Sequence, residues 1–69
     1  MPHPRLRIVV HPPSGAGGRR VHVDSEILGV AYGPGDLHEF LRRLGLDPDE
    51  IQLDDPMIEW RGGGPDVWD

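Results

Sequence analysis

The chain of 69 residues contains no cysteine, so neither a disulfide framework nor a thiolate zinc site can stabilise its fold. It also lacks lysine: all seven basic residues are arginine, a bias typical of a GC-rich genome rather than of a particular function. The amino-terminal stretch MPHPRLRIVVHPP has only a short apolar run, Ile8 to Val10, far too short for a signal-peptide core or a membrane span. We therefore expect a cytoplasmic protein that makes no membrane contact.

The chain is also short. A domain of this size buries only about 60% of the surface that its unfolded chain exposes, and a deep private active-site cavity is hard to build in it. We expect a single small domain over residues 1–69, with a flexible proline- and glycine-rich loop at 12–18 and a flexible glycine-rich tail at 62–69.

Charge of one sign is missing from the first third of the chain. Residues 1–23 carry four arginines and no acid, whereas residues 24–69 carry all twelve acids and three arginines, within a net charge of −5. An acidic chain is unlike a nucleic-acid binder, which shows clustered positive charge on a basic domain. Either the two halves pair with each other inside one fold, or one of them faces a partner of opposite charge.

Alternation of apolar and polar residues predicts two strands, Leu6 to Val10 and Arg20 to Asp24, joined as a hairpin by the loop 12–18. The favoured register pairs apolar residues on one face and opposite charges on the other: Val10 with Val21, Ile8 with Val23, Arg7 with Asp24, and Arg5 with Glu26. The alternative register sets His11 opposite His22, which brings two imidazoles together and wastes part of the apolar face. Residues 25–33 predict a further extended strand with a bulge or bend near Gly29.

A helix over residues 36–44 is the clearest element. Asp36 is the expected N-cap, with Glu39 three positions later, and Gly45 is the expected left-handed C′ residue, after which Leu46 folds back onto Leu41. The side chains expected to pack on the sheet lie at helical spacing: Leu37, Phe40, Leu41 and Leu44.

After the helix, residues 47–51 predict only a short turn, and residues 57–61 predict a closing strand with Ile58 and Trp60 inward. This β-β-α-β order predicts an α+β fold: a small two-layer structure in which an antiparallel β-hairpin and a closing β-strand are covered by one main helix. The same order resembles the start of ubiquitin-like β-grasp domains, at the level of element order only.

No arrangement of residues predicts catalysis, a cofactor or a metal. Asp36, His38 and Glu39 lie together at a helix start, where capping accounts for the acids. The loop SGAGGRR, residues 14–20, could cradle a phosphate, but it matches no phosphate-loop motif, and we favour a plain hairpin loop. The four histidines lack the spacing of metal sites.

Binding is the function that remains. Between Asp47 and Glu59 there are six acids and no base, interleaved with apolar residues. Such a segment can anchor a small inhibitor on a basic enzyme, or it can be a solvated loop whose apolar residues complete the core. We expect a non-catalytic protein-interaction module whose partner is another protein or a second copy joined through a sheet edge; the alternative is an acidic inhibitor, antitoxin or immunity-type protein. The candidate partner-binding residues are Asp49, Glu50, Leu53, Asp54, Asp55 and Trp68.

Aromatic residues are scarce, yet both tryptophans lie within the last ten residues, with three glycines between them. Trp60 is in phase with Ile58, and we expect it to be buried with its indole N–H bonded. Trp68 has two possible positions: it folds back over the open end of the core, or it stays mobile and docks on another chain. We favour folding back, because Val67 adds apolar area and the core is otherwise short of aromatics.

Overall fold

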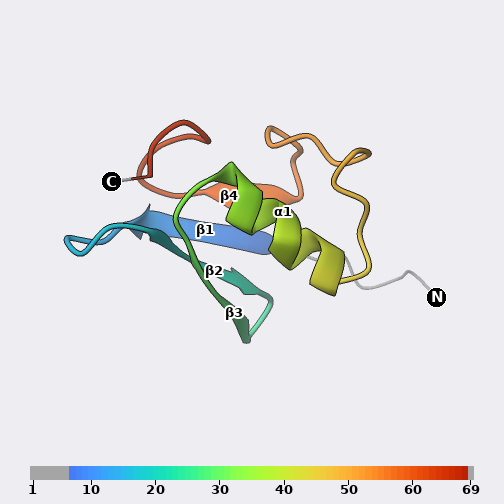
Figure 1. Ribbon diagram of the computed structural model, residues 1–69, viewed down its shortest axis with the longest axis horizontal. Helices are drawn as coiled ribbons and strands as arrows, with labels where there is room; N and C mark the ends of the chain where they lie inside the picture. The colour runs from blue at the N-terminus through green and yellow to red at the C-terminus, as the bar shows by residue number, and fades with distance from the viewer. Residues whose placement is uncertain (1–6, 69) are drawn as a thin grey trace.

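The computed structural model describes residues 7–68, which form a four-stranded sheet with one helix packed on it (Figure 1). The elements are β1 (Ile8–Pro13), β2 (Arg19–Val23), β3 (Glu26–Ala31), α1 (Pro34–Arg43) and β4 (Ile58–Trp60). The strand order is β3-β2-β1-β4; β1, β2 and β3 are antiparallel, and β4 runs parallel to β1. The predicted two-layer α+β fold is confirmed.

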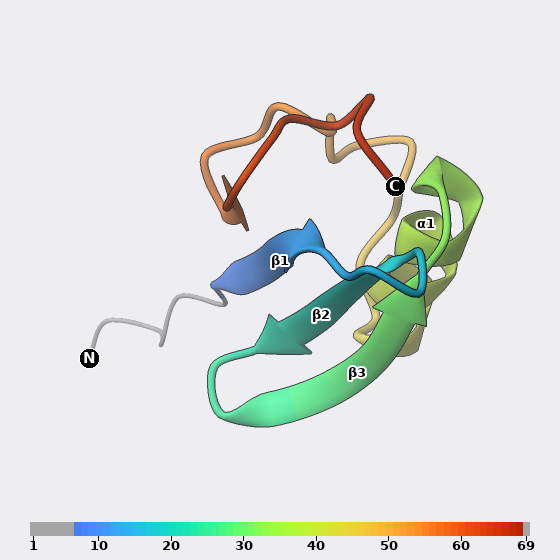
Figure 2. The same cartoon turned by 90° about the vertical axis from the view of Figure 1, so that its left-hand side faces the viewer.

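The sheet has one covered face and one face without a second layer. Alternate residues of the strands meet α1 in a core of nine buried side chains: Ile8, Val10, Val21, Val23, Ala31, Leu37, Phe40, Leu41 and Ile58. The opposite face, here called the open face, carries the residues of the other phase: Arg7, Val9, His11, Arg20, His22, Ile27, Val30, Glu59 and Arg61. Figure 2 shows α1 and the long loop after it on one side of the curved sheet.

The favoured hairpin register is confirmed, since Val10 lies opposite Val21 and Ile8 opposite Val23. Arg7 lies opposite Asp24, as predicted, but within residues 7–68 the expected charge pairing of their side chains is not formed. The Asp24 N–H donates to the Arg7 carbonyl (3.1 Å), but the Arg7 guanidinium pairs instead with Glu59 (3.0 Å), because parallel pairing places Glu59 beside Val9. The companion pair, Arg5 with Glu26, involves a residue outside the described range.

Strand β1 continues through Pro12 and Pro13, where the sequence predicted a loop. Proline is tolerated here because the ladder to β2 is irregular between Val10 and Pro13, and β4 has already ended opposite Val10. The connection to β2 is therefore shorter than predicted. It is closed by two backbone hydrogen bonds between Ser14 and Gly18 and between Gly17 and Ser14, each 3.0 Å long.

The predicted irregularity near Gly29 is confirmed. The pairing of β2 with β3 shifts so that Val21 faces Gly29 while the next residue, His22, faces Ile27, which leaves Leu28 as the extra residue of a bulge. Gly29 has φ 143°, and a Cβ at this position would lie 3.1 Å from the Phe40 ring. Glycine thus lets α1 approach β3 closely.

Helix α1 ends as predicted but starts earlier. Gly33, not Asp36, is the N-cap, because Pro34 has the φ that suits the first helical position. Asp36 lies inside the first turn and accepts the backbone N–H of Tyr32 (2.9 Å). At the other end Gly45 has φ 80°, and the Leu46 N–H donates to the Leu41 carbonyl (3.0 Å), which is the predicted Schellman ending.

Residues 44–57 connect α1 to β4 through turns, including the predicted short turn in which the Glu50 N–H donates to the Asp47 carbonyl (3.0 Å). Strand β4 has three residues rather than the predicted five, with Ile58 buried and Trp60 half-buried against the core. Within residues 7–68 the structure has no helix with the length and apolar character needed to cross a membrane.

Candidate functional site

The six residues predicted to bind a partner do not form one surface. Asp49, Glu50 and Asp54 are exposed, whereas the Asp55 carboxylate accepts the backbone N–H of Met57 (2.9 Å). The apolar residues of the acidic segment pack against the core: Ile51, Leu53 and Met57. The segment therefore has the form of the solvated loop that completes the core, and its apolar residues are not free anchors.

Trp68 folds back onto the body of the protein, which is the alternative we favoured. It packs against the core cluster, and its indole N–H donates to the Pro65 carbonyl (2.8 Å). Its own carbonyl accepts the backbone N–H of Gly18 (3.1 Å), so the tail also joins the β1–β2 connection. Trp60 is half-buried as well, and its indole N–H donates to the Leu53 carbonyl (2.8 Å), which confirms that this donor is bonded.

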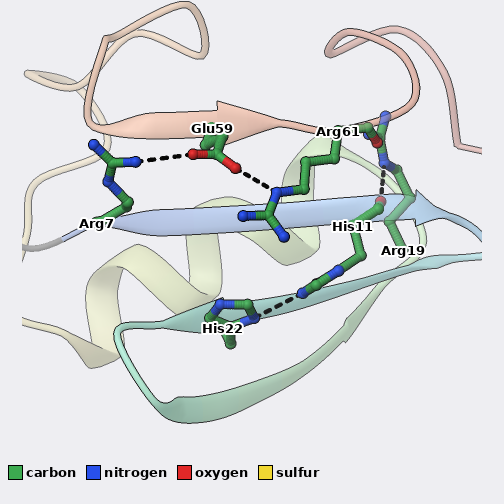
Figure 3. Close-up of polar contacts among 6 residues, drawn as sticks. All are labelled: Arg7, His11, Arg19, His22, Glu59 and Arg61. Carbon is green, nitrogen blue, oxygen red and sulfur yellow. Dashed lines mark hydrogen bonds and ion pairs between the residues drawn. The ribbon is translucent and has the colours of Figure 1, made fainter.

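Arg19 is the residue around which the tail closes. It is fully buried, and all five of its N–H donors reach backbone carbonyls at 2.7–2.9 Å. One acceptor is on β1 and four follow β4, three of them in the tail: His11, Arg61, Gly63, Gly64 and Val67. Figure 3 shows the Arg19 side chain rising past the end of β1 toward the segment after β4.

Two indole rings complete the surroundings of this cation. The Arg19 guanidinium carbon lies 5.1 Å from the Trp60 ring centroid and 5.8 Å from that of Trp68, and the two rings meet edge to face with centroids 5.8 Å apart. Burial lowers the pKa of Arg19 from its ordinary value, but a guanidinium stays protonated in proteins. Carbonyl dipoles and the faces of both tryptophans thus stabilise a buried positive charge.

Sequence reasoning missed the role of Arg19, although one signal was present. Arg19 is in phase with Val21 and Val23, so the strand alternation places it on the covered face. An arginine at a position expected to be apolar predicts a buried cation that needs partners. Its inward position also removes one arginine from the suggested phosphate loop, in which Gly17 and Gly18 already donate their N–H groups within the protein.

The open face carries a chain of alternating charges (Figure 3). Glu59 accepts from Arg7 and from Arg61, and these bonds hold the pKa of the Glu59 carboxyl below its usual value, with the Arg61 hydrogen bond as the larger cause. Val9 lies next to Glu59 in the register and is only 4% exposed, so these charged side chains cover the centre of the sheet.

His11 and His22 meet on the same face. His11 Nε2 lies 2.8 Å from His22 Nδ1, and the ring centroids are 4.7 Å apart. The contact is diagonal: His22 faces Val9 directly, so the favoured register brings the imidazoles together without placing them opposite each other. Partial burial, and after it the charges of His22, Arg61 and Arg20, lower the pKa of His11. Within residues 7–68 no three histidine, cysteine or acidic side chains are placed to hold a metal ion.

A hollow of about 250 Å³ opens on the open face beside the β1–β2 connection. Its walls combine polar and apolar groups: His11, Pro12, Ser14, Gly18, Arg20 and Val30. A Cβ on Gly18 would lie 2.7 Å from Val30 and 2.8 Å from the Tyr32 ring, so these two side chains stand next to each other at its edge.

Exposed apolar side chains continue from the hollow along β3. Tyr32 is 66% exposed, Ile27 68% and Val30 43%. Comparison of the chain with models of protein families, with curated proteins and with solved structures finds no match. The exposed apolar side chains thus lie on the same face of the sheet as the exposed Arg20.

Proposed function

We propose that the protein is a small non-catalytic interaction module of the cytoplasm that binds another protein through the open face of its sheet. The observation that carries the proposal is the grouping of exposed apolar side chains on one side of the molecule. Of the four large apolar side chains that are exposed within residues 7–68, Ile27, Val30 and Tyr32 lie along β3 and its end; the fourth, Val67, is in the tail.

The composition of this surface supports protein binding. Tyrosine and arginine are the side chains that most often carry binding energy in protein interfaces, where polar groups surround an apolar centre. Here Tyr32 and Val30 adjoin Arg20 on β2. The charged group of Arg7, Glu59 and Arg61 lies farther across the same face, beside β1 and β4. β3 is an edge strand of the sheet, so a partner strand, including that of a second copy, can also approach its outer side.

The acidic segment supports the second candidate function, an inhibitor or antitoxin that binds a basic enzyme. Asp49, Glu50 and Asp54 are exposed, so their charge is available to a basic partner. Its apolar residues, however, are engaged with the core, which leaves this surface without the anchors that the open face has.

Affinity purification of the tagged protein from its own host separates the two proposals. A double variant, Ile27→Ser and Tyr32→Ser, removes apolar anchors from the open face. A triple variant, Asp49→Asn, Glu50→Gln and Asp54→Asn, removes exposed negative charges and should leave the fold unchanged. We expect the first variant to lose the partner and the second to retain it. The opposite pattern would reject the open face and support the acidic inhibitor. Thermal unfolding of each variant checks that the fold is intact.

A further inference from the structure

We infer that the hollow beside Arg20 binds a carboxylate that is attached to an apolar group, such as an acidic or carboxyl-terminal residue of a partner chain. The inference rests on the proposed function and specifies the chemistry that the open face recognises. The hollow has a volume of about 250 Å³, that of roughly eight water molecules. This volume suits one side chain and its carboxylate rather than a large cofactor.

Arg20 supplies the charge. Arg7 and Arg61 pair with Glu59, Arg42 pairs with Glu39, and Arg19 is saturated by carbonyls. Within residues 7–68, Arg20 makes no ion pair, although its side chain is exposed and lines the hollow. A guanidinium offers two parallel N–H donors to a carboxylate, and such bidentate pairs are among the stronger hydrogen bonds of proteins.

The other walls of the hollow determine which chemical group can be attached to the bound carboxylate. The His11 imidazole can donate to a second carboxylate oxygen when its Nε2 accepts from His22 Nδ1, because its other ring nitrogen then carries the proton. The Ser14 hydroxyl already donates to the Gly17 carbonyl, so it contributes a polar wall but no donor to the carboxylate. Pro12 and Val30 are apolar, and Tyr32 stands beside Val30 at the edge. A simple inorganic anion would leave these apolar walls in water, whereas an apolar group next to the carboxylate would cover them.

The acidic segment of a second copy is a less suitable occupant. Its carboxylates are exposed, but Ile51 and Leu53 beside them pack against their own core and cannot enter the hollow without leaving it.

The test is a titration of the isotope-labelled full chain, followed by backbone amide chemical shifts, with N-acetyl-leucine and with its neutral amide. We expect saturable shifts at Gly18, Arg20 and Val30 with the carboxylate only. A second probe, in which a glutamate precedes an amidated leucine, shows whether a side-chain carboxylate binds more tightly than a chain-terminal one. Absence of a saturable shift with both carboxylates, or equal shifts with the neutral amide, would overturn the inference.

Two variants and one control anion sharpen the result. Arg20→Gln is expected to weaken binding about tenfold or more, since a hydrogen bond to a charged group contributes about 1.5–3 kcal/mol. Arg43→Gln is the matched control, because Arg43 also makes no ion pair within the described residues but lies on α1 over Phe40. Equal affinity of the two variants, or of inorganic phosphate at the same ionic strength, would contradict the proposed site. If the carboxylate site failed this test but partner capture still depended on Ile27 and Tyr32, the open face would remain the interaction surface and only the carboxylate site would be wrong.

Discussion

At the scale of single residues, Arg19 explains why the chain ends as it does. Three glycines between two tryptophans look like a flexible tether, yet Gly63 and Gly64 present carbonyls to the guanidinium and both indoles flank it. Gly63 has φ 128°, a conformation that favours glycine. The glycines thus allow the backbone to curl around one cation.

Arg19→Lys should destabilise the protein by about 2–4 kcal/mol. Lysine has three donors where arginine has five, so at least two carbonyls would lose their partner, at about 1–3 kcal/mol for each group that stays out of water. Because Arg61, Gly63 and Val67 are exposed residues, water can replace part of the loss, which keeps the total in the lower part of that range. Arg42→Lys is the control, because the Arg42–Glu39 pair is exposed and its replacement should change stability by less than about 0.5 kcal/mol. Chemical denaturation of both variants measures the difference; equal stability would refute the role of Arg19.

Stability should fall in two steps as the pH decreases. The lowered pKa of His11 means that the unfolded chain binds its proton first, so stability is lost as the pH falls below about 6.5. The lowered pKa of Glu59 acts in the same direction below about 4.5, where its pairs with Arg61 and Arg7 are broken by protonation. The groups that act on His11 are His22, Arg61, Arg20 and Glu59. Melting temperature against pH checks this, and His11→Gln should reduce the upper step; an unchanged profile would contradict it.

At the scale of elements, the sequence predicts those features of strands and helices that depend on neighbouring residues alone. The hairpin register, the bulge at Gly29 and the Schellman ending at Gly45 follow from alternation and from the conformational needs of glycine. The helix start is predicted at Asp36 because acids favour that position, but Pro34 fits the first helical position, and the structure uses both signals within one turn.

Phe40→Ala should cost about 3–5 kcal/mol, enough to unfold much of so small a domain. Phe40 is 7% exposed and its ring fills the space over Gly29, where α1 approaches β3. Tyr32→Ala provides an aromatic control, since Tyr32 is 66% exposed and should cost less than about 1 kcal/mol. Should thermal melting show no loss for Phe40→Ala, the packing of helix on sheet described above would be wrong.

At the scale of the whole molecule, long-range pairing was what the sequence could not supply. Parallel pairing of β4 with β1 brings Glu59 to Arg7, which is 52 positions away in the chain, and no local pattern specifies that contact. For the same reason the sequence predicted a binding site on the acidic segment, whereas the structure favours the open face. The acidic segment stood out by composition, whereas the open face is assembled from four strands and the hollow from β1, β2, β3 and their connection.

The most direct test of the account is the melting temperature of a chain that ends at Gly64. This truncation removes the bond from Arg19 to the Val67 carbonyl, the bond from Gly18 to the Trp68 carbonyl, and the packing of the Trp68 ring. In a domain of this size about 1 kcal/mol corresponds to about 4–8 °C, and the account predicts a fall of at least that size, with carboxylate binding at Arg20 retained once the chain is folded. An unchanged melting temperature together with loss of partner capture would show instead that Trp68 is the docking anchor and that the tail is not part of the fold.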